Sequence, residues 1–101
     1  MEERYRLIMS TIFNAIGCRV EVEKMIATGR IDMVVETTQY IYVLELKLSD
    51  NGGVDAAAEQ IRAKQYAEPF KADKRKVIAL AVELDETGKG LIDWKEVDES
   101  L

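Results

Sequence analysis

The spacing of apolar residues predicts an amphipathic helix at the start of the chain, from Glu2 to Ile16. A stripe at helical spacing comprises Tyr5, Ile8, Ile12 or Phe13, and Ile16. Gly17 follows the stripe as the residue that ends the helix. Arg4 and Arg6 lie off the stripe, so we expect them on the exposed side.

Alternating and continuous apolar runs then predict strands. Residues 19–24 alternate, with Val20 and Val22 on one face, which is typical of a half-buried strand. Residues 29–47 are rich in β-branched, aromatic and aliphatic types, with a polar, turn-sized break over residues 36–39. This stretch predicts a β-hairpin.

A second helix is predicted from Val54 to about Ala67, after the loop Ser-Asp-Asn-Gly-Gly. Asp50 or Asn51 would cap its start, and Pro69 would end it. The stripe expected to face the core comprises Ala56, Gln60, Ala63, Ala67 and Phe70. Gln60 is its polar exception, either a core amide with its hydrogen bonds satisfied or a side chain aimed into a cleft.

The remaining pattern completes a mixed sheet. Residues 77–82 are almost continuously apolar, which indicates a central strand buried on both faces. Residues 91–97 read as a last edge strand, with Trp94 covering the core. The order α-β-β-β-α-β-β predicts an α/β or α+β domain over residues 1–101, with a mixed central sheet flanked by helices.

The hairpin carries the candidate chemistry. A turn centred on Thr38 and Gln39 makes Asp32 face Glu45 directly across the two strands, and Lys47 shares their face. Directly opposed side chains have Cβ atoms roughly 4.5–5.5 Å apart, close enough for two carboxylates to share one ion. Ile31, Met33, Leu44 and Leu46 would then be buried on the opposite face.

Two interpretations of this charged pair remain open. Facing carboxylates repel unless a cation lies between them, a proton is shared or water screens both. As a metal site, Asp32 and Glu45 would be ligands. As a structural charge ladder, Arg30 and Lys47 would neutralise them in a four-charge checkerboard. The apolar residues Val34, Ile41 and Val43 on the same face favour a partly covered cleft over an open surface.

Composition narrows the chemistry. The chain of 101 residues is 48% hydrophobic, enough for one modest core. It has no histidine and a single cysteine, Cys18, which excludes an internal disulfide, Ser-His-Asp and Cys-His catalysis and the commonest zinc ligands. Any metal is therefore expected to be a hard, oxygen-bound ion such as Mg²⁺ or Mn²⁺. With no membrane-length apolar run and no signal-peptide pattern, we expect a cytoplasmic protein without a membrane partner.

The negative charge is concentrated at one end. The net charge of −5 resides entirely in residues 83–101, which contain seven acids, among them Glu99, and two lysines, Lys89 and Lys95. The rest of the chain sums to zero. Residues 71–76 form the locally basic cluster, which is typical of a solvated loop.

The arrangement resembles the PD-(D/E)xK nuclease superfamily. The segments that carry the resemblance are GRID, ELK, QIRAKQYAEPF and IDW, and they span nearly the whole chain. They are similar to a nuclease-like domain of bacterial proteins that follows an AAA-ATPase-like region. Glu2, fifteen residues before Gly17, matches the glutamate of that pattern, and Tyr5 matches its aromatic residue.

The resemblance implies a restriction-endonuclease-like αβββαβ core and a set of site residues. By this resemblance Asp32 and Glu45 bind Mg²⁺ or Mn²⁺, Lys47 activates water, and Glu2, Gln60 and Tyr66 are accessory. The implied function is Mg²⁺-dependent hydrolysis of phosphodiester bonds in DNA. The alternative is a non-catalytic interaction or regulatory module of a larger ATPase-like protein, for which an upstream ATPase domain would be the partner. The acidity of the chain favours the alternative slightly, because phosphate affinity comes from Lys and Arg.

Overall fold

The computed structural model describes residues 1–98, so Glu99, one of the C-terminal acids, lies outside the described residues. The elements in chain order are α1 (Glu2–Ala15), β1 (Arg19–Ile26), β2 (Gly29–Glu36), β3 (Tyr40–Leu48), η1 (Ser49–Asn51), α2 (Gly53–Lys64), η2 (Glu68–Phe70), β4 (Lys76–Leu84) and β5 (Leu91–Val97). The predicted order of helices and strands is confirmed.

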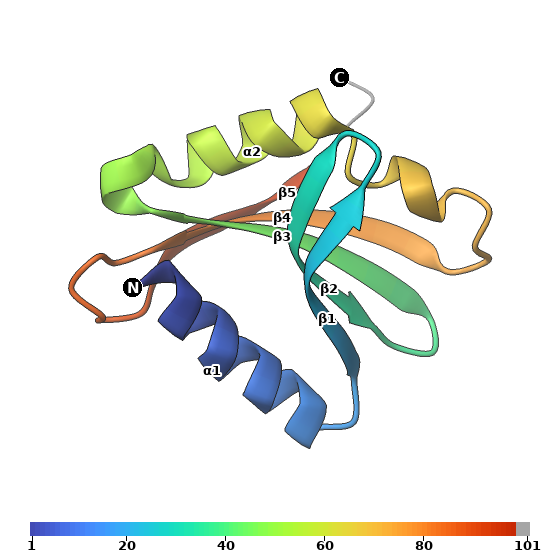
Figure 1. Cartoon of the computed structure of the whole chain (residues 1–101), viewed down its shortest axis with the longest axis horizontal. Coiled ribbons are helices and arrows are strands. Elements are labelled where there is room, and N and C mark those ends of the chain that lie inside the picture. Colours follow the sequence, from blue (N-terminus) through green and yellow to red (C-terminus); the bar gives the residue numbers. More distant parts are fainter. Residues whose placement is uncertain (99–101) are drawn as a thin grey trace.

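The strands form one mixed sheet in the order β1-β2-β3-β4-β5. Neighbouring strands are antiparallel except β3 and β4, which are parallel and joined through α2. Parallel neighbours need a long crossover, and the helix supplies it. Figure 1 shows α1 and α2 on opposite faces of the sheet. β4 lies between β3 and β5, as the continuous apolar run predicts.

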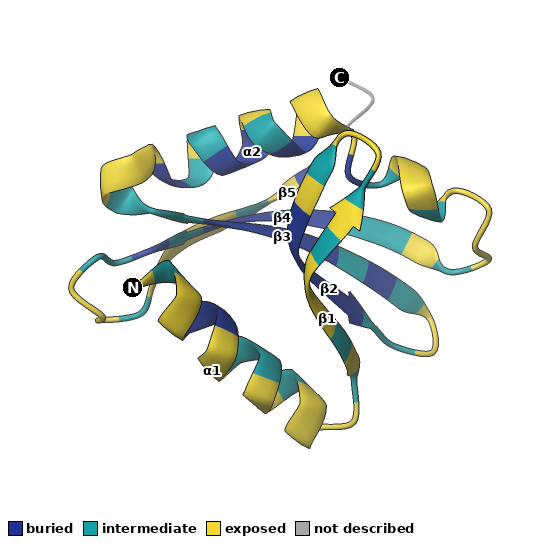
Figure 2. Ribbon diagram, viewed as in Figure 1, coloured by how far each residue is buried: buried dark blue, intermediate teal, exposed yellow. Residues whose placement is uncertain are grey.

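Each face of the sheet buries its own apolar cluster (Figure 2). The cluster under α2 includes Ala57, Ala58, Ile61, Val34, Ile41, Val43 and Ala81. The cluster under α1 includes Tyr5, Met33, Val35, Leu44, Leu46 and Val82. Alternate residues of β3 therefore enter opposite clusters, which is the pattern expected of a sheet covered on both sides.

The predicted register of β2 on β3 is confirmed, but the ladder stops early. Pairing runs from Glu36 with Ile41 to Met33 with Leu44. The first part of β2, residues 29–32, is not paired with β3. Beyond this point β2 stays with β1, and the two curl toward α2 (Figure 1). At the tip of that hairpin the Thr28 hydroxyl donates to the Lys64 carbonyl at 2.5 Å.

This curl makes one expectation wrong. Ile31 is buried, but it packs in the cluster under α2 rather than with Met33, Leu44 and Leu46 on the other face. The sequence alternation assumes a strand that continues flat along its neighbour. Because β2 leaves β3 and bends, residues on either side of the bend no longer keep that alternation.

The buried stripe of α1 is also different from the prediction. Tyr5 is buried, with Met9 and Phe13 packed beside it, whereas Ile8, Ile12 and Ile16 are exposed. The Tyr5 hydroxyl fixes the rotation of the helix, because it donates to the Asp85 carbonyl at 2.8 Å and accepts from the Gly90 N–H at 2.9 Å. The buried face then includes Arg6, which the sequence placed outside it.

Both ends of α2 differ from the prediction. Its N-terminus is capped not by Asp50 or Asn51 but by Glu83 of β4, whose carboxylate accepts from the Val54 N–H at 2.9 Å and from the Ser49 hydroxyl at 2.6 Å. The helix ends at Lys64, three residues before Ala67, because Gln65 adopts a left-handed conformation with φ of 50°. Its buried residues are Gly53, Ala57, Ala58 and Ile61, not the predicted stripe.

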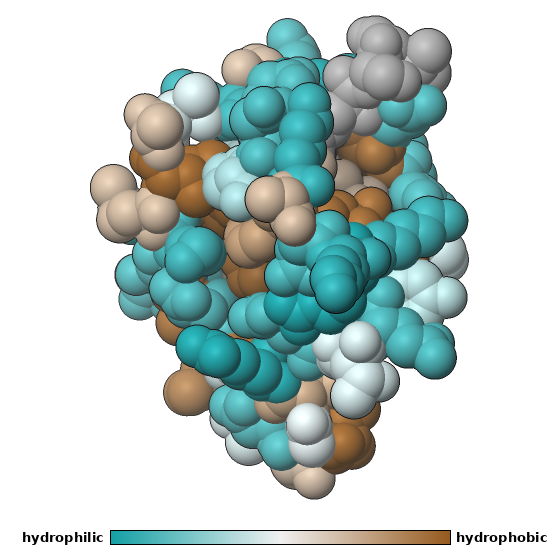
Figure 3. Space-filling model, turned by 90° about the vertical axis from the view of Figure 1, so that its right-hand side faces the viewer, coloured by the Kyte–Doolittle hydropathy of each residue, from teal (hydrophilic) through white to brown (hydrophobic). Residues whose placement is uncertain are grey.

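The outer parts of the sheet are less covered than predicted. Trp94 on β5 is 58% exposed and Val22 on β1 is 44% exposed, so neither is a core residue. On the face shown in Figure 3, hydrophilic side chains dominate and hydrophobic ones show only in small patches between them. Among residues 1–98, neither helix is long and apolar enough to cross a membrane.

Replacing Gly53 by alanine tests the contact between the start of α2 and Glu83. Gly53 has φ of +60°, and an added Cβ would collide with the Glu83 carboxylate that caps the helix. We expect Gly53→Ala to lower the free energy of unfolding by roughly 1–2 kcal/mol, because alanine is strained in a left-handed conformation. The weakened helix cap should lower it further. Urea denaturation measures the loss. Gly17→Ala is the control, since its backbone is also left-handed but nothing lies within 4 Å of its added Cβ. Equal losses in the two variants would contradict the Glu83 contact.

Candidate functional site

The fork where β2 leaves β3 holds Asp32, which is buried, with 6% of the residue exposed. Its Oδ2 accepts the backbone N–H of Leu46 from β3 at 2.8 Å. The Asp32 carboxylate thus lies next to Met33 and Leu44, the last paired residues of the two strands. A buried carboxylate needs such a donor, and the donor also fixes its orientation.

Glu45 of β3 enters the fork beside it and is 2% exposed. The hydroxyl of Tyr66 lies 2.8 Å from Glu45 Oε1 and 2.9 Å from the Arg30 carbonyl. Nε2 of Gln60 donates to that hydroxyl at 2.9 Å. Gln60 therefore orients Tyr66, and Tyr66 orients Glu45, which brings three of the residues named from sequence together.

The early end of α2 makes this contact. In a continuous helix, residues six positions apart lie on different faces, so Gln60 and Tyr66 would not meet. The left-handed Gln65 ends the helix and turns Tyr66, which is fully buried, back under the sheet. The feature that makes the helix prediction wrong is therefore the one that builds this part of the site.

Lys47 lies at the mouth of the fork. Its Nζ is 3.7 Å from Glu45 Oε2, and its side chain is partly open to solvent. The checkerboard instead predicted that Lys47 pairs with Asp32 and Arg30 with Glu45, and the ion pairs of residues 1–98 include neither of these. Arg30 instead ion-pairs with Glu23 at 4.0 Å on the exposed side of the hairpin, and the cation nearest Asp32 comes from α1.

That cation is Arg6, which the sequence analysis missed. It is 9% exposed, and its guanidinium lies 3.0 Å from Glu23, 3.4 Å from Glu2 and 3.9 Å from Asp32. Glu2 thus joins the cluster through its neighbour one helical turn away. The spacing of four between Glu2 and Arg6 was the available signal, since such pairs share a helix face.

Burial and like charge shape the protonation of the cluster. Burial first, and the nearby Asp32 charge second, raise the pKa of Glu45 to about 8, and a hydrogen bond between the two carboxyl groups adds to this. Burial also raises the pKa of Tyr66 well above its usual range, so it stays a donor. Burial and the Asp32 charge raise the pKa of Glu2 as well. At neutral pH Glu45 therefore keeps its proton.

The fork offers oxygen ligands for a small hard cation, but only two carboxylates converge there. Among residues 1–98, no group of three His, Cys, Asp or Glu side chains has a metal-binding arrangement. Asp32 and Glu45 each have one oxygen anchored by a donor, and each has a second oxygen whose nearest cation is 3.7–3.9 Å away. Mg²⁺ commonly binds through one or two carboxylates and keeps several waters, so this donor set fits it.

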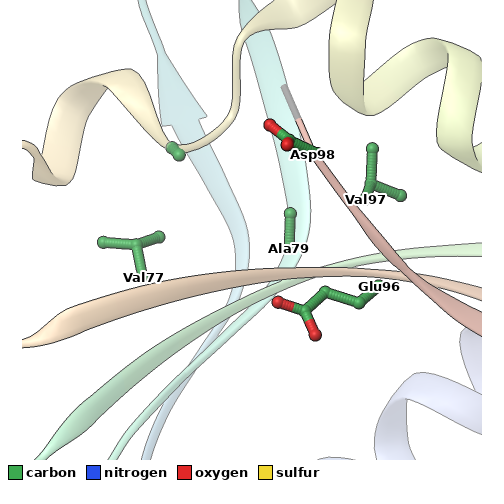
Figure 4. Close-up of a pocket in the computed structure, with 6 residues that line it drawn as sticks. Val77, Ala79, Glu96, Val97 and Asp98 are labelled. Atoms are coloured by element: carbon green, nitrogen blue, oxygen red, sulfur yellow. The ribbon is translucent and has the colours of Figure 1, made fainter. Parts of the chain in front are cut away.

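One pocket lies away from the fork. It has a volume of about 470 Å³ and is lined by Ala67, Val77, Ala79, Glu96, Val97 and Asp98 (Figure 4). Figure 4 shows the Glu96 side chain on the other side of β4 from Val77 and Ala79. The lining brings two carboxylates and no basic side chain, so it is unsuited to a phosphate. It shares no residue with the fork.

The basic loop has less free charge than its sequence indicates. The Arg75 guanidinium lies 2.7 Å from Glu36 and 2.8 Å from Asp73 and donates to the Thr37 carbonyl at 3.1 Å. Lys71 lies 2.7 Å from Glu68. The contacts of Arg75 with Glu36 and Thr37 tie the loop to the β2–β3 turn.

Comparison with known proteins adds two findings. The profile of the PD-(D/E)XK nuclease superfamily matches residues 1–94. An uncharacterized protein in the vnfD 5′ region of Azotobacter chroococcum mcd 1 is 29% identical over 100 residues, which is 99% of this chain and 19% of that protein. The chain thus spans about a fifth of this curated relative. No solved structure matches the chain.

The raised pKa of Glu45 makes the free energy of unfolding depend on pH. Folded Glu45 keeps its proton up to about pH 8, whereas the unfolded chain releases it near 4.5. The folded state therefore binds more protons between these values, and the free energy of unfolding falls as pH rises through this window. Without metal we expect Glu45→Gln to remove this fall, which is on the order of a few kcal/mol. Urea denaturation in EDTA from pH 5 to 9 measures it.

The control for that series is Glu68→Gln, which changes an exposed glutamate. It should keep the wild-type dependence on pH. An equal fall in wild type and Glu45→Gln would show that Glu45 is not the group responsible.

Removing the Tyr66 hydroxyl should change the pH at which the free energy of unfolding falls. Its hydrogen bond favours ionised Glu45, so Tyr66→Phe should raise the pKa of Glu45 further and shift the fall in stability to higher pH. Losing this buried partner should also cost about 1–3 kcal/mol at neutral pH. Tyr42→Phe, on the other face of β3, is the control. A transition that stays in place would rule out the Tyr66 contribution.

Proposed function

Since the chain belongs to the PD-(D/E)XK nuclease superfamily, we propose that it hydrolyses phosphodiester bonds of DNA with Mg²⁺ or Mn²⁺. The observation that supports this most is the pair of buried carboxylates at the β2–β3 fork, oriented by Leu46 and Tyr66 and accompanied by Lys47. Two adjacent buried acids are unfavourable without a proton or a cation between them, and such pairs cluster at functional sites.

Asp32 and Glu45 would hold the metal ion. When bound there, Mg²⁺ neutralises charge on the phosphate and lowers the pKa of water. The protein contributes orientation. Leu46 N–H holds one oxygen of Asp32, and the Tyr66 hydroxyl, itself held by Gln60, faces one oxygen of Glu45. Metal binding requires Glu45 to lose its proton, so affinity should increase with pH.

Lys47 would act on the attacking water and the phosphate. Its Nζ lies beside Glu45 yet is partly open to solvent, so it can reach a substrate while its charge stays fixed near the fork. An ammonium group there stabilises hydroxide and the negative charge that develops on the phosphate oxygens. Glu2, whose pKa is raised, is an accessory proton acceptor on the α1 side.

DNA would approach from the side of the β1–β2 hairpin. Arg30 is exposed there, and the Lys64 side chain lies beside Gly29, 3.5 Å from where a Cβ on that residue would be. These cations can contact phosphates, which is where affinity for DNA comes from. Further contacts would come from a neighbouring domain such as the ATPase-like region that the resemblance implies.

A cleavage assay on single- and double-stranded DNA and RNA, with Mg²⁺, Mn²⁺ or EDTA, tests the function. We expect cleavage of DNA that requires metal and that falls at least about 100-fold in Lys47→Ala and Asp32→Asn. Lys95→Ala is the matched control, since Lys95 is also a strand lysine paired with an acid, Asp55, at 3.2 Å. It should keep wild-type activity.

The assay also separates the alternative function. A folded protein that cleaves no substrate, and whose melting temperature does not respond to millimolar Mg²⁺ or Mn²⁺, would be a non-catalytic module. Cleavage that Lys47→Ala leaves intact would contradict the role of Lys47. Cleavage of RNA alone would replace DNA as the substrate.

A further inference from the structure

Arg6 is the buried cation of the site, and its three partners are all acids. Its Nη2 donates to Glu23 Oε1 at 3.0 Å, and its Nη1 lies 3.4 Å from Glu2 and 3.9 Å from Asp32. Glu23 meets it from β1 in a left-handed conformation with φ of 54°, one of two such non-glycine residues described in the chain. Non-glycine residues rarely adopt this conformation, and the contact gives a reason for it here.

The ligand carboxylates do not depend on Arg6 for their orientation. Asp32 is held by the Leu46 N–H, and Glu45 by Tyr66 and Gln60. The Arg6 contact to Asp32 is the longest of its three contacts and is an ion pair rather than a hydrogen bond. What Arg6 supplies to Asp32 is therefore positive charge.

We propose that Arg6 is an internal counter-cation that competes with the divalent ion for Asp32 and so sets the metal affinity of the site. In the metal-free protein it offsets the negative charge of Asp32 and Glu2. When a divalent ion binds, the two cations repel across the same carboxylate. Arg6 therefore stabilises the metal-free fold at the expense of metal affinity. This inference rests on the proposed metal site at Asp32 and Glu45.

The surroundings of Arg6 leave its guanidinium space to move away from Asp32. A pocket of about 300 Å³ opens beside it, lined by Glu3, Arg6, Leu7, Ser10, Val22 and Glu23. Arg6 can turn toward this space and keep its shortest contact, the one to Glu23, while it moves away from Asp32. Glu23 is then a positioning residue that holds Arg6 back from the metal ligands.

The test is Mn²⁺ binding measured by calorimetry on the whole chain, without substrate. Coulomb's law makes the repulsion between a unit charge and a divalent ion a few ångströms away worth about tenfold in affinity, even at the dielectric constant of water. We expect Arg6→Gln to bind Mn²⁺ about tenfold more tightly than wild type. Its metal-free melting temperature should be lower, and Mn²⁺ should raise that temperature more than in wild type.

Two variants separate charge from packing. Arg6→Lys keeps the positive charge and should bind Mn²⁺ within about twofold of wild type, whereas a purely structural role of Arg6 would weaken binding in both substitutions. Arg19→Gln removes the same charge from an 81% exposed side chain that pairs with Glu36 at 3.8 Å. It should leave the affinity unchanged, because solvent screens that charge.

Glu23→Gln keeps the inference testable if Arg6→Gln fails to fold. It releases Arg6 from its closest partner and should weaken Mn²⁺ binding at least about threefold. Unchanged or weaker binding in Arg6→Gln, or unchanged binding in Glu23→Gln, would overturn the inference. Failure of the proposed function is distinct, because wild type would then show no Mn²⁺ binding that Asp32→Asn abolishes.

Discussion

The contact between two buried carboxyl groups, Asp32 and Glu45, is the constraint on which the rest of the structure depends. Two ionised acids cannot stay side by side in a low-dielectric interior, so their surroundings must supply donors and positive charge. The backbone of β3, the Tyr66 hydroxyl, Lys47 and Arg6 do so from different elements. Burial and the Asp32 charge nevertheless raise the pKa of Glu45 to about 8, so at neutral pH a proton on Glu45 removes the remaining negative charge.

The fork between β2 and β3 explains how both faces of one sheet reach the same site. Residues on a flat, fully paired strand belong to one face or the other, and α1 and α2 cover opposite faces. Because β2 leaves β3 beyond Met33, Asp32 meets Arg6 from α1, while Glu45 meets Tyr66 from beyond the end of α2. The opening in the sheet therefore allows side chains from both helical layers to reach one site.

Sequence predicted the strands, their register and the closeness of Asp32 and Glu45, because period-two alternation and a turn-sized break determine these locally. It failed where long-range contacts decide. Glu83 of β4 caps α2 at Val54, 29 residues earlier in the chain, and Tyr5 sets the rotation of α1 through the β4–β5 connection. Arg6 was missed because a charged residue outside an apolar stripe is usually exposed. The spacing to Glu2 was readable in the sequence, but only the folded chain brings Glu23 and Asp32 to the same guanidinium.

The energetics of the pair also bear on the choice between nuclease and interaction module. A protein selected only to present a surface gains nothing from two adjacent buried acids, and a glutamine at position 45 would keep the shape without the repulsion. Natural proteins retain such destabilising arrangements mainly where function uses them. Asp32 and Glu45 are costly to the metal-free fold and suited to a hard divalent ion. Their presence beside Lys47 therefore supports the metal-dependent nuclease over the module without catalysis.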